Sequence, residues 1–236
     1  MTEGHLAWRD ALRRFVDKEI MPYAEDWDEA GHIPIALWPK AAEVGLLGAG
    51  YPEQYGGMET DSWHSWIINE ELSRVGVGGL SASLMVHGIG LPPVINWGTE
   101  AMKAEIAPPV LRGESWISLG ITEPGGGSDV ASLQTTAVRD GDHYIVNGSK
   151  TYITGGMRAN YVSTAVRTGG DGATGVSMLL IPTDAEGFSR TALDKKMGWW
   201  ASDTATLYFD NVRVPVSNLI GQENQGFRVI MTNFNS

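Results

Sequence analysis

The sequence contains no cysteine, which excludes disulfide bonds and thiolate metal sites and fits a reducing compartment. Basic residues are few as well, and the formal net charge of −11 argues against a nucleic-acid-binding surface. No apolar run approaches the roughly 18 residues of a membrane span. The first residues mix acidic, basic and apolar side chains, unlike a signal peptide. These absences predict a cytoplasmic protein without a membrane span.

The first part of the chain has the periodicity of helices. A length of 236 residues with 42% hydrophobic content suits one or two globular domains. Apolar side chains recur at helical spacing up to about residue 115. We expect helices at 6–20, 33–47, 80–88 and 99–106, with a further one after Asp61, and Asp61 and Thr99 as N-caps. The sequence therefore predicts an all-α domain over residues 1–115.

At Trp116 the period changes to that of strands. Short apolar or alternating runs follow at 116–121, 133–138, 144–146, 151–154, 161–167, 176–181, 188–193, 204–209 and 212–214. The dipeptide Asn147-Gly148 predicts a hairpin between two of them. No stretch is long enough for a crossover helix, so a parallel sheet is excluded. We predict an antiparallel β-barrel or sandwich over residues 116–221, and an α+β fold class.

After Gly221 the helical period returns. Phe227, Ile230, Met231 and Phe234 share one helix face, and the sequence supplies no later segment to cover it. We interpret residues 222–236 as the start of a third, helical domain of a longer protein.

One glycine-rich segment stands out in the β region. Gly120 to Asp129 follows an apolar run and contains three consecutive glycines between Thr122 and Ser128. Glycines free the backbone to take positive φ and leave no Cβ in the way of a ligand. The two hydroxyls supply donors and acceptors beside that bare backbone. By itself the segment favours a cofactor-binding loop and a plain surface turn equally.

A second segment favours the cofactor. Residues 150–156 read Lys-Thr-Tyr-Ile-Thr-Gly-Gly, and strand alternation puts Tyr152 and Thr154 on one face. An aromatic plane beside a hydroxyl suits a flat heteroaromatic ring with hydrogen-bonding edges, such as a flavin.

In this order and separation, the two segments resemble the acyl-CoA dehydrogenase family of flavoproteins. The first is similar to its T-E-P-x-x-G-S-D signature and the second to its (W/Y/F)-I-T-(N/G)-G segment. The similarity continues through 147–150, 196–204, 209–215 and 221–227. The resemblance implies FAD-dependent α,β-dehydrogenation of an acyl-CoA thioester, within fatty acid metabolism.

The resemblance also implies a set of site residues. Those expected to bind FAD are Leu119, Gly120, Ile121, Thr122, Gly127, Ser128, Tyr152, Ile153 and Thr154. Of these, Ser128 is also expected to approach the pantetheine of the substrate, and Thr154 to donate to the flavin near N5. The family's catalytic base lies on a C-terminal helical bundle, beyond residue 236, so no catalytic residue is assigned. The piece of 236 residues is expected to be inactive alone.

Other residues receive less specific expectations. Glu123 and Asp129 are expected to accept backbone N–H groups and hold the loop. Trp200 stands where the family often has a basic residue after Met-Gly-x, and core positions are favoured for Trp199 and Trp200. Arg167 is the one cation near the loop 169–175, which approaches the CoA phosphates in relatives. The five histidines are scattered along the sequence, without metal-ligand spacing.

Two alternatives stay open beside the dehydrogenase. One is a flavin-dependent oxidase or monooxygenase of the same fold, and the other is a non-catalytic partner subunit that binds flavin or acyl-CoA. The family further implies a homotetramer that passes electrons to an electron-transfer flavoprotein.

Overall fold

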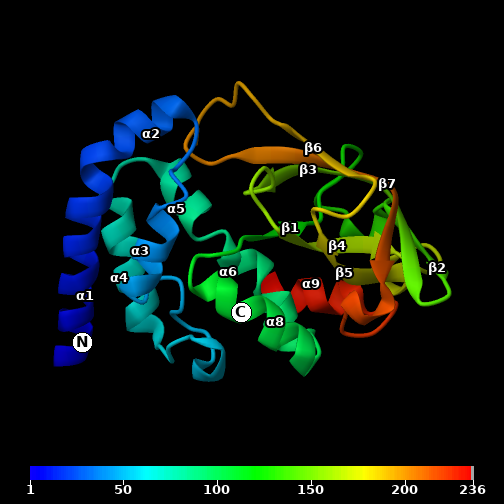
Figure 1. Ribbon diagram of the computed structural model, residues 1–236, viewed down its shortest axis with the longest axis horizontal. Coiled ribbons are helices and arrows are strands. Elements are labelled where there is room, and N and C mark those ends of the chain that lie inside the picture. Colours follow the sequence, from blue (N-terminus) through cyan, green and yellow to red (C-terminus); the bar gives the residue numbers. More distant parts are fainter. Residues whose placement is uncertain (235–236) are drawn as a thin grey trace. The chain divides into compact units, whose positions relative to one another are not determined.

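The computed structural model describes residues 1–234. The chain forms two compact units, and neither is continuous in sequence. The first contains Met1–Met85, Ala107–Ser115 and Lys195–Asp203, and the second contains Val86–Ile106, Trp116–Asp194 and the chain from Thr204. The predicted order of a helical part followed by a β-sheet part is confirmed (Figure 1). The predicted domain limits, 1–115, 116–221 and 222–236, stay predictions.

The first unit is helical, as the periodicity predicts. Its helices are α1 (Glu3–Phe15), α2 (Ala24–Ala30), α3 (Leu37–Glu43), α4 (Ser62–Ser73) and α5 (Gly78–Leu84). α1 continues through a π-helical turn, Val16–Ile20, so the helix predicted for 6–20 is present. The helix predicted for 33–47 is shorter, and Pro39 lies in its first turn, where a missing N–H costs nothing. α1 packs against α4 and buries Leu12 and Phe15.

The N-terminal end of α4 is fixed by a side chain. Asp61 is its N-cap, as predicted, and Oδ1 accepts the N–H groups of Trp63 and His64 at 3.0 and 3.3 Å. The same carboxylate lies 3.1 Å from His5 Nε2 and 2.8 Å from His64 Nδ1. His5 and His64, far apart in sequence, therefore meet at one carboxylate. The packing of α1 on α4 brings His5 to Asp61, 56 positions away, so the scatter of the histidines along the sequence does not extend to these two in space.

The segment Lys195–Asp203 belongs to the helical unit although strands precede and follow it in sequence. A Cβ on Gly79 would lie 2.8 Å from the backbone of Trp199, so a glycine is needed at this contact. The Ala201 N–H donates to Asp28 Oδ1 at 2.8 Å. The favoured core placement of the two tryptophans is wrong: Trp199 is 61% exposed and Trp200 49%. The Trp199 indole also lies close to α5, since a Cβ on Gly78 would be 2.8 Å from its Nε1, yet most of the ring stays exposed.

The second unit is built on one sheet of eight strands. They are β1 (Ile117–Gly120), β2 (Thr136–Asp140), β3 (His143–Thr154), β4 (Tyr161–Arg167), β5 (Val176–Pro182), β6 (Phe188–Ala192), β7 (Thr204–Pro215) and β8 (Leu219–Ile220). Their order is β6-β7-β3-β2-β4-β5-β8, and β1 pairs with β4.

The sheet is mainly antiparallel, and the exclusion of a parallel sheet holds, but two of its pairings are parallel. β1 runs parallel to β4, with Ile117 opposite Tyr161 and Gly120 opposite Thr164, and β2 meets β4 in parallel at one residue pair. The sequence lacks a crossover helix here, but a helix is only the usual connection between parallel strands. Here the connection between the parallel strands β1 and β4 contains the antiparallel pair β2–β3 instead of a helix. The sheet is therefore mixed.

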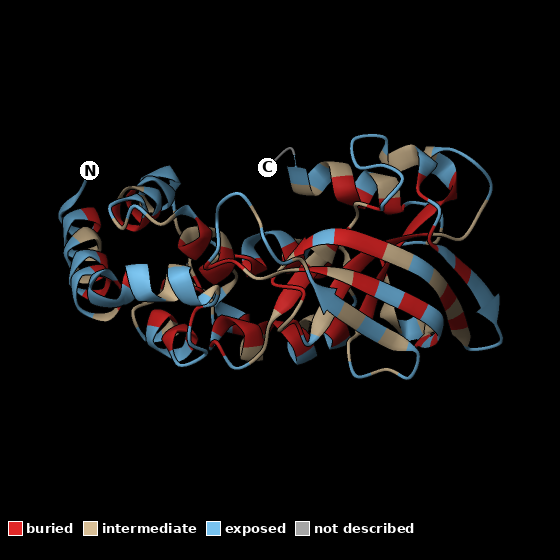
Figure 2. Ribbon diagram, turned by 90° about the horizontal axis from the view of Figure 1, so that it is seen from above, coloured by how far each residue is buried: buried red, intermediate tan, exposed pale blue. Residues whose placement is uncertain are grey.

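Two predicted interruptions are bulges within long strands. Asn147-Gly148 lies inside β3, where the register shifts between Val146 and Gly148, so the hairpin predicted there is wrong. Gly148 has a φ of 144°, and a Cβ there would lie 2.7 Å from Thr135 Oγ1. β7 likewise continues through Asn211, whose φ is 53°. Residues with positive φ serve bulges as well as turns. Buried and exposed residues largely alternate along both strands (Figure 2).

Helices of the second unit cover part of the sheet. α6 (His87–Gly90) packs on β1, and α9 (Gly226–Phe234) packs on β5 and on α7 (Pro92–Trp97) (Figure 1). The face predicted for α9 is only partly buried: Ile230 is, but Phe234 is 60% exposed, and the helix has a partner in β5. α8 (Glu100–Leu111) is capped by Thr99 as predicted and continues through its two prolines. Residues 235–236 of the predicted third domain lie outside the described residues.

Within residues 1–234, the structure contains no single helix with the length and apolar content that crossing a membrane requires.

The contact of α6 with β1 generates a prediction with an internal control. A Cβ on Gly90 would lie 2.7 Å from the Ile117 carbonyl oxygen, whereas one on Gly88 meets nothing within 4 Å. Gly90→Ala should lower the free energy of unfolding by about 2 kcal/mol through overpacking. Gly88→Ala, in the same helix, should leave it unchanged or raise it slightly. Urea denaturation of both variants measures this, and equal effects would contradict the contact.

Candidate functional site

The two segments singled out in the sequence meet at the end of β1. The Thr151 N–H donates to the Thr122 carbonyl at 2.8 Å, and Ser118 Oγ donates to the Thr154 carbonyl at 2.8 Å. The first bond is possible because the β3–β7 ladder shifts register between Lys150 and Ile153. Residues about 30 positions apart are thus joined backbone to backbone, on the second unit alone.

Tyr152 occupies the gap in that ladder. Its φ is 59°, in the left-handed region that a bulky side chain rarely adopts, and its side chain is 67% exposed. Such a conformation costs on the order of 1–3 kcal/mol and concentrates at functional sites. Ile153, by contrast, is buried in the core of the sheet, and Thr154 is half-buried. The ring of Tyr152 is therefore held outward at a cost in backbone energy.

The glycine loop is shaped by a short turn. The Glu123 N–H donates to the Gly126 carbonyl at 2.9 Å, and the Gly126 N–H donates back at 3.1 Å. None of the three consecutive glycines has a positive φ, so the first of the two reasons expected for them does not apply. What matters at Gly127 is the missing Cβ, which would lie 3.3 Å from Thr122 Cγ2. Gly127 and Thr122 are therefore side by side.

The remaining predicted residues divide into supporting and accessible positions. A Cβ on Gly120 would lie 2.9 Å from Val162, so this glycine is required by the approach of β4. Leu119 and Ile121 are half-buried, and Ser128 is exposed. The carboxylate of Asp129 is also exposed and accepts no hydrogen bond from residues 1–234, so the holding role expected of it is wrong.

A buried ion pair lies under the loop. Lys150 is fully buried, and its Nζ donates to Glu123 Oε1 at 2.8 Å and to the Ile121 carbonyl at 3.0 Å. Glu123 also accepts the Thr135 N–H at 2.8 Å and the Gln134 N–H at 2.6 Å. The holding role predicted for Glu123 is confirmed. No role was predicted for Lys150, although a lysine at a core-facing strand position is an available signal.

The two groups titrate in ways that their surroundings explain. Burial lowers the pKa of Lys150 to about 8, because desolvation of the ammonium outweighs the attraction of Glu123. Burial also acts to raise the pKa of Glu123, but the charge of Lys150 and hydrogen bonds from Lys150, Thr135 and Gln134 outweigh it. The pKa of the Glu123 carboxyl is held below its usual value. Glu123 is therefore an ionised, fully engaged carboxylate.

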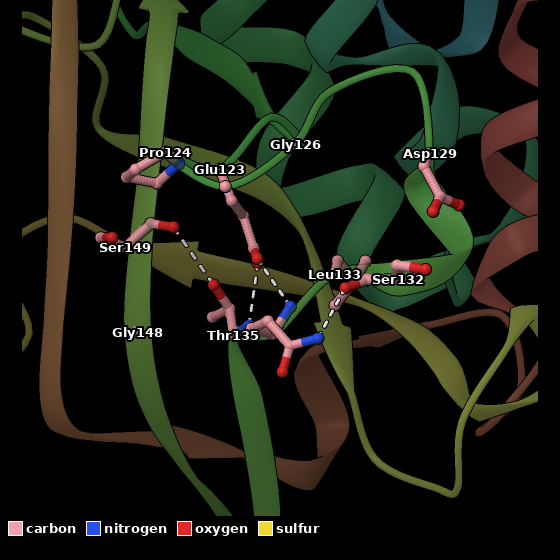
Figure 3. Close-up of a pocket in the computed structure, with 11 residues that line it drawn as sticks. Glu123, Pro124, Gly126, Asp129, Ser132, Leu133, Thr135, Gly148 and Ser149 are labelled. Atoms are coloured by element: carbon pink, nitrogen blue, oxygen red, sulfur yellow. Dashed lines mark hydrogen bonds between the residues drawn. The ribbon is translucent and has the colours of Figure 1, made fainter.

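A cavity of about 430 Å³ lies beside the loop. Its lining residues are Glu123, Pro124, Gly125, Gly126, Asp129, Ser132, Leu133, Gln134, Thr135, Gly148 and Ser149. Figure 3 shows the Glu123 side chain reaching toward the backbone at Thr135. None of the nine residues predicted to bind the cofactor lines this cavity. The predicted site is instead the surface around Thr122 and Tyr152.

Arg167 is not free to meet a phosphate. Its guanidinium donates to the carbonyls of Leu133, Ala131 and Gly170 at 2.9, 2.7 and 2.5 Å, and to that of Gly172 at 3.2 Å. The loop 169–175 is shaped around this residue, which acts as a structural cross-link.

Comparison with known proteins gives consistent matches. Residues 2–114 match the family model "Acyl-CoA dehydrogenase, N-terminal domain", and residues 118–212 match "Acyl-CoA dehydrogenase, middle domain". Acyl-CoA dehydrogenase AFT10-1 of Alternaria alternata is 39% identical over 247 residues, which cover 98% of this chain and 57% of that protein. The chain spans about half the length of the curated relatives it matches.

Solved structures agree. A probable acyl-CoA dehydrogenase from Mycobacterium abscessus is 48% identical with a TM-score of 0.96, over 99% of this chain and 62% of that chain. An acyl-CoA dehydrogenase from Bacillus anthracis, in complex with FAD, is 31% identical with a TM-score of 0.91, over 100% of this chain and 40% of that chain.

The strained backbone at Tyr152 can be tested by removing the strain. Tyr152→Gly should leave the free energy of unfolding unchanged or raise it by up to about 1 kcal/mol, because glycine adopts positive φ freely. Tyr208→Gly is the control: Tyr208 is 41% exposed in β7 with ordinary strand geometry, and its loss should cost about 1 kcal/mol. Denaturant unfolding decides, and a clear loss of stability in Tyr152→Gly would contradict the strain.

The buried pair predicts a pH-dependent effect. Glu123→Gln should lower the free energy of unfolding at pH 7 by about 3 kcal/mol, since it leaves the Lys150 ammonium buried without a counter-charge. Because the pKa of Glu123 is lower folded than unfolded, its contribution is present above about pH 4.3 and lost as the pH falls through the folded pKa. The difference between wild type and variant should therefore shrink in acid. A difference independent of pH would contradict this ion pair.

Proposed function

Because this chain belongs to the acyl-CoA dehydrogenase family, we propose that the whole protein binds FAD and oxidises an acyl-CoA thioester between its α and β carbons. The single observation that carries the proposal is the junction of the two segments, in which the Thr151 N–H donates to the Thr122 carbonyl. This bond sets a hydroxyl-bearing loop beside the outward-held ring of Tyr152.

The residues present fit a flavin on three grounds. Tyr152 offers an exposed aromatic face in a conformation that costs energy. The N–H of Thr122 has no acceptor among residues 1–234, so it is available to a ligand's polar edge. Beside it, Gly127 leaves room that a Cβ would take. These features together suit a flat ring with hydrogen-bond acceptors along one edge.

We assign the cofactor site to Leu119, Gly120, Ile121, Thr122, Gly127, Ser128, Tyr152, Ile153 and Thr154, in two roles. Thr122, Ser128, Tyr152 and Thr154 would contact FAD directly. Gly120 and Ile153 would act from within the sheet, since the packing of β4 and the core occupies their side-chain space.

When bound, FAD supplies the acceptor for the hydride that leaves the β carbon. The protein's part is to orient the ring and stabilise the charge that it gains. Thr154 would donate its hydroxyl near N5, Thr122 would hold the opposite polar edge, and the ring of Tyr152 would lie against the flavin. The exposed hydroxyl of Ser128 would meet the cofactor's phosphate side and the pantetheine of the substrate.

A carboxylate base must take the α proton, and the acids of this region do not suit that task. Glu123 is buried and engaged by Lys150 and two backbone N–H groups. Asp129 lies on an exposed turn outside the predicted site. As the family resemblance implies, we propose that the base lies beyond residue 236. An electron-transfer flavoprotein as acceptor, a homotetrameric assembly and a cytoplasmic location complete the proposal.

The protein at its full natural length provides the test. It should purify yellow, and an acyl-CoA added without oxygen should bleach the flavin absorbance near 450 nm, with slow recovery in air. Acyl-CoAs of several chain lengths and branching patterns should be tried, with the free acids as controls. Rapid recovery with hydrogen peroxide would identify an oxidase instead. A colourless protein that refuses FAD would identify a partner subunit and refute the proposal.

A further inference from the structure

We propose that Lys150 is a positioning residue of the flavin site, which fixes the peptide between Ile121 and Thr122 so that the Thr122 N–H faces the cofactor. The inference rests on the proposed function, because it assumes that FAD occupies the surface around Thr122 and Tyr152. It concerns a residue that never touches the flavin itself.

The position of Lys150 requires an explanation. The side chain is fully buried, whereas the other polar residues that the strands bury, such as Ser163, Thr164 and Ser177, are neutral hydroxyls. Burying an ammonium is costly, and a buried ion pair can usually be replaced by apolar residues without loss of stability. Stability alone therefore gives a weak reason for a lysine here, and a specific geometric task gives a stronger one.

That task is visible in the two bonds of the ammonium. One goes to Glu123 Oε1 at 2.8 Å and the other to the Ile121 carbonyl at 3.0 Å. Residues 1–234 contain no cis peptide, so the Thr122 N–H points opposite to the Ile121 carbonyl. A carbonyl held inward by Lys150 thus turns the next N–H away from the buried ammonium. This same N–H has no acceptor within the described chain.

Thr122 is held from its other side as well. Its carbonyl accepts the N–H of Thr151, the residue after Lys150. One short piece of β3 therefore fixes both peptides of Thr122, and the next residue is the strained Tyr152. The loop donor and the aromatic ring consequently share one rigid support, which is what a preorganised site needs.

Glu123 has a different role from Lys150. Its carboxylate balances the charge of Lys150 and ties the loop to Gln134 and Thr135. It makes no bond to the Ile121 carbonyl. The charge of Lys150 is balanced by Glu123, whereas the orientation of the Ile121–Thr122 peptide depends on Lys150 alone. Variants can therefore change one without the other.

The test uses three variants of the protein at full natural length. Lys150→Met removes both bonds and leaves Glu123 unbalanced. Glu123→Gln with Lys150→Met restores charge balance but leaves the Ile121 carbonyl without its donor. Lys103→Met is the matched control, because Lys103 also pairs with a neighbouring acid, Glu100, at 2.8 Å on α8. The measurements are the denaturation midpoint, the FAD dissociation constant and the absorption spectrum of the bound flavin.

We expect Lys150→Met to be destabilised and to bind FAD at least ten-fold more weakly. The double variant should regain most of the stability yet keep the ten-fold weaker binding and an altered flavin spectrum. A double variant that binds FAD with wild-type affinity and spectrum would reduce Lys150 to a structural residue and overturn the inference. Failure of the proposed function looks different, since the wild-type protein would then bind no FAD.

A second measurement needs no variant. Amide hydrogen exchange at Thr122 should slow at least ten-fold when the FAD-free wild-type protein is reconstituted with FAD. Exchange at Gly88, an exposed residue of α6, serves as the reference. An unchanged rate at Thr122 in a protein that does bind FAD would overturn the inference, whatever the variants do.

Discussion

The buried pair of Glu123 and Lys150 is the constraint on which the candidate site depends. It joins the end of β1, the segment leading into β2 and the middle of β3 through four donor–acceptor contacts. In a buried setting each of these groups must be satisfied, since an unpaired one costs about 1–3 kcal/mol. The contacts therefore restrict the loop's geometry, and in this geometry the Thr122 N–H has no acceptor among residues 1–234.

The strained backbone of Tyr152 is held by contacts close to this ion pair. A left-handed tyrosine persists only where neighbouring contacts over-determine it. The contacts here are the Thr151–Thr122 bond on one side and the buried Ile153 on the other. Buried residues thus supply rigidity, while Tyr152, Thr154 and Ser128 remain accessible. This division of roles is what a site for a planar cofactor requires in a member of the acyl-CoA dehydrogenase family.

Sequence rules based on neighbouring residues predicted the change of periodicity and the helix caps correctly. They failed for Asn147-Gly148, because Asn-Gly can form either a hairpin turn or a bulge. The change from helical to strand periodicity near residue 115 and the caps Asp61 and Thr99 depend on nearby residues, and the structure has them. Asn147-Gly148 has the composition of a turn but forms a bulge in β3, because β7 pairs with both halves of the strand. Pairing with a distant strand cannot be read from the dipeptide.

By itself, the sequence determined the succession of helical and β parts, the ordered signature and hence the family, because these depend on periodicity and on the order of residues. Only the tertiary structure decided the parallel pairing of β1 with β4, the approach of His5 to Asp61, and the burial of Lys150 under the Ile121 carbonyl. Each of these joins residues that are far apart in sequence. These contacts form only when the chain folds and brings the distant segments together. A pattern of neighbouring residues does not specify which of the possible long-range pairings is the most stable.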